Sequence, residues 1–405
     1  MKAVILAAGS GERLEPVTQT RPKQFIPILG KPLISYVIEE LRKLNLDIII
    51  VVNNAYREYF ESRIGSLVKL VIQNEGKGTA AALNAVRNSV SGNENILLMY
   101  GDVFLGDLGI IEKVIREESE NVILGVRVQN PKDYGVLVAD HNNELKEIIE
   151  KPENPPSNLI NGGIYKLGPD IFHYLEKISK SPRGELELTD AVSLMSKSSK
   201  VKVLKYEGFW IDIGRPWDIL SVNKWALDNL LYSKNVGNVE DFVKIKGKVI
   251  IEEGAEIRSF SYIEGPTYIG KGCHIGPHSY IRPYTVLLND VKIGTHTEIK
   301  ESIVMENSKI PHLSYVGDSV IGEDVNFGAG TVIANLRFDE KEIKMNVKGQ
   351  RVSSGRKKLG AIIGDHVRTG INVTILPGIK IGAYAKIYPG SVVNRDVNQG
   401  EFFKA

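Results

Sequence analysis

Apolar side chains return at every sixth residue through much of the second half of the chain. They occupy positions 251, 257, 263, 269, 275, 281, 287, 293 and 299 without a miss. The period resumes at Ile321, Phe327 and Ile333, and again at Ile363, Ile375, Ile381, Ile387 and Val393. A period of six matches neither the turn of an α-helix nor the alternation of an ordinary strand. It predicts a solenoid of coils stacked about 4.8 Å apart, with one inward side chain on each flat face and a turn at each corner.

The repeat also has a family likeness. Glycine often follows the apolar residue, as in "YIGKGCHIGPHSY" (268–280). Such coils resemble the left-handed parallel β-helix of hexapeptide-repeat acyltransferases, a known exception to the right-handed crossover rule. The resemblance implies a left-handed β-helix over residues 241–405.

The first half of the chain has a different pattern, in which short apolar runs alternate with amphipathic stretches. The runs at 3–6, 47–52, 68–73, 95–100 and 121–126 predict buried strands, and those at 32–44, 78–90 and 216–232 predict helices. Strands that alternate with helices indicate a mostly parallel sheet covered by helices on both faces. We therefore expect an α/β domain over 1–215 and a helical linker over 216–240.

Composition excludes several classes of function. The net charge of +2 gives no reason to expect nucleic acid or an acidic membrane surface as a partner. No stretch approaches the roughly 18 consecutive apolar residues of a membrane span. The single cysteine, Cys273, excludes an intrachain disulfide framework and is typical of a reducing compartment, so we expect a cytoplasmic protein.

A glycine-rich turn follows the first predicted strand. Gly9 and Gly11 allow backbone N–H groups to approach phosphate oxygens. Arg13 and Lys23 come next and can neutralise a triphosphate and the departing pyrophosphate. Alone, this pattern is a weak signal, because a tight strand-to-helix turn also favours glycine.

Further motifs strengthen the prediction of a phosphate site. The segment "LAAGSGERLEPVTQTRPKQFIPI" (6–28) resembles the signature of sugar-1-phosphate nucleotidylyltransferases, and later motifs follow in that family's order. The resemblance implies a Rossmann-like mixed sheet and two groups of ligand-binding residues. The nucleotide and its phosphates would be held by Ala8, Gly9, Gly11, Gln73, Gly78 and Thr79. The sugar phosphate would be held by Gly135, Glu150, Lys151 and Asn161.

Two aspartates complete this inventory. "YGDVF" supplies Asp102, and "FWIDIG" supplies Asp212, which the same resemblance identifies as metal ligands. Attack of a sugar phosphate on the α-phosphate of a nucleotide brings two anions together and expels pyrophosphate. Two carboxylates suit a hard Mg²⁺ ion that bridges such phosphates, while Arg13 and Lys23 act as the catalytic cations. The overall likeness favours UTP or dTTP as the nucleotide.

The rod carries its own candidate chemistry. "IRPYTVL", "GTHTEIKES", "IPHLSYVGDS" and "VNFGAGTVIANL" resemble, in order and spacing, the acetyltransferase domain of the bifunctional N-acetylglucosamine-1-phosphate uridylyltransferase family. The resemblance identifies His312 as the base that deprotonates an attacking amine, a task suited to neutral imidazole. It implies sugar-phosphate binding by Arg282, Glu298, Lys300, Tyr315 and Asn326, with Asn335 beside the amine. The backbone N–H of Ala329 would face the thioester oxyanion of acetyl-CoA.

A basic insertion interrupts the coils between Leu336 and Lys358. We interpret it as a flap in which Lys341 and Lys344 meet the phosphates of acetyl-CoA, although an exposed charged loop would look the same. Two residues depart from the bacterial pattern, Leu336 in place of tyrosine and Ile371 in place of serine. These departures suggest that galactosamine-1-phosphate is accepted as well as glucosamine-1-phosphate.

The first half of the chain also departs from its family at Glu12, where the family prefers a small hydroxyl residue. We expect Glu12 to point away from the phosphates or to pair with Arg13.

Three functions remain open from sequence. The first, which we favour, is a bifunctional enzyme that acetylates an amino-sugar 1-phosphate and joins the product to UTP or dTTP. The resemblance of the rod to the acetyltransferase family implies that this enzyme is a homotrimer. The second is a nucleotidylyltransferase, for instance a GDP-mannose maker, whose β-helix is a strut. The third is a regulatory subunit that binds sugar nucleotides without catalysis, against which the intact Lys23, Asp102 and Asp212 argue.

Overall fold

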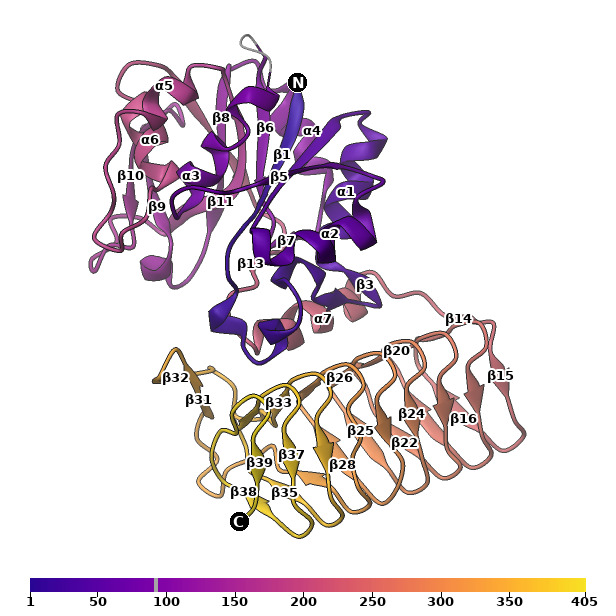
Figure 1. Ribbon diagram of the computed structural model, residues 1–405. Helices are drawn as coiled ribbons and strands as arrows, with labels where there is room; N and C mark the ends of the chain where they lie inside the picture. The colour runs from indigo at the N-terminus through magenta and orange to yellow at the C-terminus, as the bar shows by residue number, and fades with distance from the viewer. Residues whose placement is uncertain (91–93) are drawn as a thin grey trace. The chain divides into compact units, whose positions relative to one another are not determined.

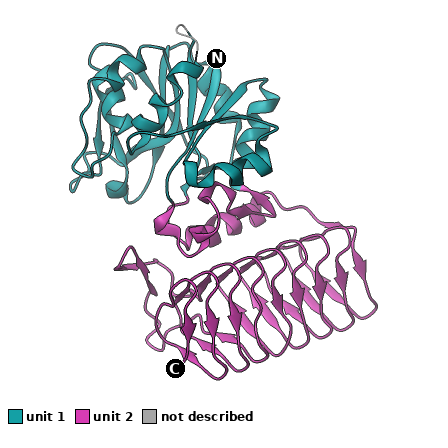
Figure 2. Ribbon diagram, viewed as in Figure 1, with its two compact units in different colours: residues 1–10, 33–212 teal, residues 11–32, 213–405 magenta. Residues whose placement is uncertain are grey.

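The computed structural model describes residues 1–90 and 94–405, which form two compact units (Figure 2). The first unit comprises Met1–Ser10 and Leu33–Asp212, and the second comprises Gly11–Pro32 and Ile213–Ala405. The grouping of residues 11–32 with the second unit was not foreseen in the domain bounds expected from sequence. Within the described residues, every helix is too short or too polar to cross a lipid bilayer.

A mixed sheet forms the centre of the first unit (Figure 1). Its strands follow the order β10-β9-β11-β6-β1-β4-β5, with β8 and β12 attached beside β11. One half is parallel and was predicted from the apolar runs: β1 (Lys2–Ala7), β4 (Asp47–Val52), β5 (Lys69–Ile72) and β6 (Ile96–Tyr100). β1, β4 and β6 are almost entirely buried, which explains their continuous apolar character, whereas β5 at the edge of the sheet is only partly buried.

The other half of the sheet is largely antiparallel. It contains β8 (Asn121–Arg127), β9 (Gly135–Ala139), β10 (Leu145–Glu150), β11 (Leu159–Leu167) and β12 (Val201–Tyr206). Only β8 was predicted, because β9 is short, β10 and β12 have charged residues along them, and β11 contains two glycines. The expected Rossmann-like mixed sheet is nevertheless confirmed.

Helices cover this sheet on both faces. They are α1 (Leu33–Lys43), α2 (Arg57–Ile64), α3 (Thr79–Asn84), α4 (Gly109–Arg116), α5 (Ile171–Leu175) and α6 (Leu188–Met195). The helix expected over 78–90 is shorter than predicted, since α3 ends at Asn84 and a 3₁₀ turn follows at Arg87–Ser89. Asn and Ser favour turns because their side chains compete for backbone hydrogen bonds. A small ribbon of β7 (Val103–Leu105) and β13 (Trp210–Asp212) lies apart from the main sheet.

Most of the second unit is a parallel β-helix with three faces, so the expected fold class is confirmed (Figure 1). The first face contains β14 (Lys234–Asn235), β17 (Val249–Ile251), β20 (Thr267–Ile269), β23 (Thr285–Leu287), β26 (Ile303–Val304), β29 (Val320–Ile321), β33 (Ile362–Ile363) and β36 (Lys380–Ile381). The second contains β15 (Asn238–Val239), β18 (Glu256–Ile257), β21 (His274–Ile275), β24 (Lys292–Ile293), β27 (Lys309–Ile310), β34 (Arg368–Thr369), β37 (Lys386–Ile387) and β39 (Phe402–Phe403). The third contains β16 (Lys244–Lys246), β19 (Tyr262–Glu264), β22 (Tyr280–Ile281), β25 (Glu298–Lys300), β28 (Tyr315–Gly317), β30 (Val332–Ile333), β35 (Thr374–Ile375) and β38 (Val392–Val393).

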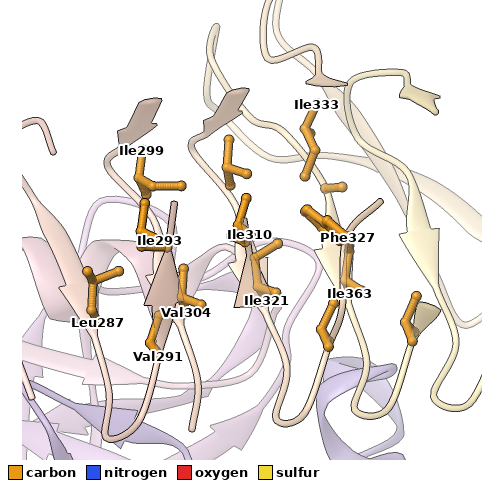
Figure 3. Packing of buried hydrophobic residues seen from close by; sticks show 14 of the residues in the cluster. Leu287, Val291, Ile293, Ile299, Val304, Ile310, Ile321, Phe327, Ile333 and Ile363 are labelled. Carbon is orange, nitrogen blue, oxygen red and sulfur yellow. The ribbon is translucent and has the colours of Figure 1, made fainter. Parts of the chain in front are cut away.

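The sixfold period is the spacing of the core residues in these coils. Ile263 pairs with Ile281, and Ile281 with Ile299, so one coil takes eighteen residues and three faces. All three side chains are fully buried, and Figure 3 shows how such side chains stack along the rod. Burying a side chain of this size contributes about 1.5–3 kcal/mol.

Two coils are one residue shorter than the others. Ile299 pairs with Val316, an offset of seventeen, and Val304 then follows Ile299 by five residues instead of six. The shortening falls at the corner between the third and first faces, where Glu301 and Asp318 adopt left-handed backbone conformations. This shift explains why the period seemed to lapse between Ile299 and Ile321, although the core is continuous there.

The basic insertion leaves the rod at the same corner. An antiparallel bridge between Leu336 and Lys358 forms its base, and β31 (Lys344–Val347) pairs with β32 (Gln350–Ser353) at its tip. A smaller layer of the second unit combines α7 (Asp218–Asn229) with the hairpin of β2 (Pro27–Ile28) and β3 (Lys31–Pro32). Asn223 joins them, since its side chain bonds the backbone of Pro27 and Leu29 at 3.0 and 2.8 Å.

Candidate active sites

The candidate nucleotide site of the first unit lies where neighbouring parallel strands end. Leu6 of β1 pairs with Tyr100 of β6, so Ala8 and Gly9 follow β1 at the edge where Asp102 follows β6. Gly101 N–H donates to Leu6 O at 2.9 Å and holds the two chain segments together. Ligands of open α/β sheets bind outside the carboxyl ends of such strands.

Asp102 and Asp212 come from segments far apart in sequence. β13 runs antiparallel to β7 and places Asp212 directly opposite Val103, the neighbour of Asp102. Both aspartates are partly buried. Mg²⁺ is usually held by one or two carboxylates together with substrate phosphates, so this donor set fits the ion. Across residues 1–90 and 94–405 no group of three or more His, Cys, Asp or Glu residues is arranged to hold a metal ion.

The segment predicted to bind the base is held by specific contacts. Gln73 Nε2 donates to Gly76 O at 3.1 Å, which closes the loop before α3. Gly78 has a φ of 103°, and a Cβ atom there would lie 2.3 Å from Leu186 O, so only glycine fits. Thr79 Oγ1 accepts a hydrogen bond from Leu188 N at 2.9 Å. Gly78 and Thr79 therefore act at least as structural residues of this loop.

The residues predicted to hold the sugar are brought together on the antiparallel half of the sheet. Gly135 and Glu150 are direct partners in the β9–β10 pair, and the glycine leaves room for the Glu150 carboxylate. Glu150 accepts hydrogen bonds from Arg183 at 3.0 Å and Thr189 at 3.2 Å, two contacts that sequence analysis missed. Lys151 follows in a left-handed conformation and is exposed.

Asn161 belongs to a buried polar cluster. Its Nδ2 donates to Tyr165 Oη at 2.5 Å, and its Oδ1 accepts from Gly163 N at 2.9 Å. Burial raises the pKa of Tyr100 to about 12, so this phenol, 3.1 Å from Tyr165 Oη, stays protonated at neutral pH. The cluster fixes the position of Asn161 at the edge of the site.

Arg13 and Lys23 belong to segment 11–32 of the second unit. Arg13 is exposed in a 3₁₀ turn at Glu12–Leu14, and Lys23 is half-buried in another at Lys23–Phe25. Gly11 precedes the first turn in a left-handed conformation, and Thr18 Oγ1 donates to its carbonyl at 2.9 Å. Glu12 Oε2 forms an ion pair with Lys348 Nζ of the insertion, at a distance of 2.7 Å. This contact between the loop and the insertion was not predicted.

Most of the residues predicted for acetyl transfer lie together on the third face of the rod. Tyr280, Glu298 and Tyr315 occupy one register column. Arg282 Nη1 donates to Glu298 Oε1 at 2.8 Å, and Asn335 Nδ2 donates to Tyr315 Oη at 3.2 Å. Stacking of coils thus brings together four predicted residues, of which the first and last, Arg282 and Asn335, are 53 positions apart in the chain.

Three charged residues of this cluster were missed by sequence analysis. They are Glu301, Asp318 and Arg356. Arg356 Nη2 donates to Glu301 Oε1 at 2.6 Å and lies 3.6 Å from Asp318 Oδ1. Burial acts to raise the pKa of Glu301, but the hydrogen bond from Arg356 and the neighbouring cationic charges outweigh it and lower the pKa. The sequence signal that could have identified Glu301 and Asp318 is the loss of one residue from the repeat at this corner.

His312 lies at the opposite edge of the same face. It is exposed at the corner between β27 and β28, not buried in the core of the rod. Its carbonyl accepts from Gly330 N at 3.2 Å, which places Ala329 on the next coil at the same corner. Asn326, in contrast, pairs with Lys309 and Arg368 on the second face, whereas Glu298, Lys300 and Tyr315 lie on the third.

The lysines predicted to meet coenzyme A are exposed on the insertion. Lys341 precedes β31 and Lys344 begins it, while Ile343 and Met345 between and beside them are buried. Leu336 and Ile371, which depart from the bacterial pattern, are 42% and 54% exposed. They are therefore available to a ligand and are not needed for the core.

Comparison with known proteins covers both halves. A nucleotidyl transferase family model matches residues 2–229, a GMPPB C-terminal domain model matches 245–353, and six bacterial transferase hexapeptides match 360–395. A solved structure titled as a putative glucose-1-phosphate thymidylyltransferase from Bacillus anthracis is 28% identical, with a TM-score of 0.51 over 56% of this chain and 95% of that one.

Curated relatives match at full length. A bifunctional sugar-1-phosphate nucleotidylyltransferase/acetyltransferase of Sulfurisphaera tokodaii is 66% identical over 100% of both chains. The bifunctional protein GlmU of Methanocaldococcus jannaschii is 46% identical over 99% of this chain and 97% of that protein. With both candidate sites in place, the chain belongs to the family of bifunctional sugar-1-phosphate nucleotidylyltransferase/acetyltransferases.

Proposed function

We propose that the rod transfers the acetyl group of acetyl-CoA to the amine of glucosamine-1-phosphate, and that residues 2–229, which match the nucleotidyl transferase model, join the product to UTP or dTTP. The observation that carries the acetyl-transfer step is the cluster of Arg282, Glu298 and Lys300 with Tyr315 and Asn335 on one face, with an exposed His312 at its edge. A structural strut needs no such set of outward-facing polar groups.

In the acetyl transfer, His312 takes the proton that the attacking amine loses as the new amide bond forms and the coenzyme A thiolate leaves. General-base catalysis of this kind contributes about 10²–10⁴-fold. Arg282 and Lys300 would bind the phosphate of the amino sugar, and the N–H of Ala329 would donate to the developing oxyanion.

In the nucleotidyl transfer, the sugar phosphate itself attacks the α-phosphate, so no nucleophilic side chain is required. Arg13 and Lys23 would offset the charge of the triphosphate, and Gly9 and Gly11 would let backbone N–H groups approach it. Asp102 and Asp212 would hold Mg²⁺, which supplies positive charge to the phosphates when bound. Gln73 would contact the base, and Asn161 and Glu150 the sugar.

The position of Asn326 supports a homotrimer. Because Asn326 lies on the second face and most of the other predicted residues lie on the third, a neighbouring copy could present it to the same substrate. We expect a trimer by light scattering. Mixed trimers of His312→Ala and Asn326→Ala chains should recover part of the acetyl transfer that each variant alone lacks; no recovery would place the whole site on one chain. A cytoplasmic location, expected from the single cysteine, is part of this proposal.

Release of free thiol from acetyl-CoA in the presence of amino-sugar 1-phosphates tests the acetyl-transfer step. We expect activity with glucosamine-1-phosphate, and activity with galactosamine-1-phosphate would follow from the departures at Leu336 and Ile371. His312→Ala should lose at least a hundredfold of this activity and retain pyrophosphate release from UTP. Thiol release from neither sugar would refute the proposal.

The match of residues 245–353 to the GMPPB C-terminal domain favours one alternative, in which the β-helix is only a strut. That alternative predicts pyrophosphate release with no consumption of acetyl-CoA. Pyrophosphate release from a panel of nucleotides and sugar 1-phosphates that includes GTP with mannose-1-phosphate, together with thiol release from acetyl-CoA, separates the two proposals.

A further inference from the structure

Asp318 carries a buried carboxylate at the shortened corner of the rod. Its side chain is 1% exposed, and its backbone has a φ of 51°, a conformation that Asp tolerates better than most residues. A charge this deeply buried is stable only when it is paired and hydrogen-bonded. What surrounds Asp318 therefore indicates why it is there.

Two of its partners are residues already placed in the acetyl-transfer site, and Arg356 Nη2 lies 3.6 Å from its other oxygen, Oδ1. Lys300 Nζ donates to Asp318 Oδ2 at 2.9 Å, and Asn335 Nδ2 donates to the same oxygen at 2.5 Å. The three residues come from successive coils: Lys300 pairs with Gly317, the residue before Asp318, and Asn335 follows β30 on the next coil.

The carboxylate determines which way the Asn335 amide faces. An ionised carboxylate only accepts hydrogen bonds, so the NH₂ group of Asn335 must face Asp318. The second contact of Nδ2, with Tyr315 Oη, uses its other hydrogen. Both donors are then occupied, and Asn335 presents only its carbonyl oxygen to a ligand.

An acceptor in this position suits a substrate amine. An attacking –NH₂ group has hydrogens to donate, and a bond from one of them to Asn335 Oδ1 would orient the nitrogen. Lys300 is fixed by the same carboxylate, which lowers the conformational entropy that it loses when it binds a phosphate.

We propose that Asp318 is a positioning residue of the acetyl-transfer site, which holds the Asn335 carbonyl toward the amine of the amino sugar and fixes Lys300 for its phosphate. The inference rests on the proposed acetyl transfer. Under this proposal Asp318 does not contact acetyl-CoA and takes no part in the nucleotidyl-transfer reaction.

Asp318→Asn tests this role with almost no change of shape. An amide at 318 can donate as well as accept, so Asn335 is free to turn over. We expect kcat/KM for the amino-sugar phosphate to fall about ten- to a hundredfold, while the KM for acetyl-CoA and pyrophosphate release from UTP stay unchanged. A comparable rise in the KM for acetyl-CoA, or an equal fall in pyrophosphate release, would indicate a general structural role and overturn the proposal.

A double-mutant cycle with Asn335→Ala isolates the mechanism. If Asp318 acts through Asn335 and Lys300, the loss in the double variant should be clearly smaller than the product of the two single losses. Fully multiplicative losses would contradict the proposal. Pyrophosphate release and the melting temperature of the same preparations report whether each variant has folded.

Asp324→Asn is the matched control. Asp324 also turns a corner of the rod with a φ of 50°, and it pairs with Arg368 at 2.6 Å, but it lies at the second face. We expect its acetyl-transfer kinetics to equal those of the wild type. Wild-type protein that releases no thiol at all would refute the proposed function, whereas normal kinetics in Asp318→Asn would refute this inference alone.

Discussion

Arg21 Nη2 donates to Asp365 Oδ2 at 2.6 Å, and both side chains are almost completely buried. Thr20 Oγ1 donates to the same carboxylate oxygen at 2.5 Å. The pair lies inside the second unit and fastens segment 11–32, which carries Arg13 and Lys23, to the coil that begins with β33. The segment that carries the two predicted catalytic cations is thus held by the rod.

Asp365→Ala should destabilise the second unit by about 3–5 kcal/mol, because it leaves the Arg21 charge buried without its partner. Urea unfolding followed by the fluorescence of Trp217 and Trp225, both in this unit, measures the loss. The control is Glu401→Ala, which breaks an exposed pair with Arg395 and should leave the transition in place. Identical curves for the two variants would show that the buried pair does not form in solution.

Glu306 makes the stability of the same region depend on pH. Burial raises the pKa of its carboxyl group, and the charges of Glu323 and Asp365 add to that effect, while Arg21 opposes it. A carboxyl group with a raised folded-state pKa stabilises the fold below its unfolded pKa and loses that contribution as pH rises through the folded value. Glu306→Gln should therefore raise the free energy of unfolding at pH 8 and leave it nearly unchanged at pH 4.

The exposed Glu253 provides the comparison for this titration, since its side chain is 82% exposed. Glu253→Gln should have no pH-dependent effect in the same unfolding experiments. If Glu306→Gln were equally stabilising at pH 4 and pH 8, the titration of Glu306 would not be the cause.

The two aspartates of the first unit should be required for only one of the reactions. Asp102→Asn and Asp212→Asn should each lower pyrophosphate release at least a hundredfold, because a neutral amide is a poor ligand for Mg²⁺. Thiol release from acetyl-CoA by the same proteins should be unchanged. Removal of Mg²⁺ with a chelator should reproduce this pattern in the wild type, and retained pyrophosphate release in either variant would exclude that residue as a ligand.

The exposed lysines of the insertion should affect the binding of coenzyme A. Lys341→Ala and Lys344→Ala should each raise the KM for acetyl-CoA roughly fivefold, since an exposed charge pair contributes at most about 1 kcal/mol. Acetylpantetheine, which lacks the nucleotide phosphates, should show no difference between variants and wild type. Lys357→Ala, exposed on the same insertion, is the control; a change in kcat in place of KM would argue against phosphate binding.

Much of the candidate site could be predicted because its chemistry is carried by short motifs. The glycine turn after β1, Asp102 after β6 and the segment around His312 each lie within a few residues of a strand end, where local sequence determines the conformation. Gly135 and Glu150 were also found as motifs, but their direct pairing depends on an antiparallel register that no local pattern reveals. Arg183 and Thr189 were missed for the same reason.

The sequence by itself determined the rod and the parallel half of the sheet, because burial imposes a strict period on the side chains that face a core. Ile263, Ile281 and Ile299 could be assigned to one interior from their spacing alone. Outward-facing residues obey no such period. Only the stacking of coils decided that Lys300 and Asn335 both donate hydrogen bonds to the carboxylate of Asp318. A single residue missing from a corner moves a whole column of side chains, and its effect is visible only when the coils are placed one above another.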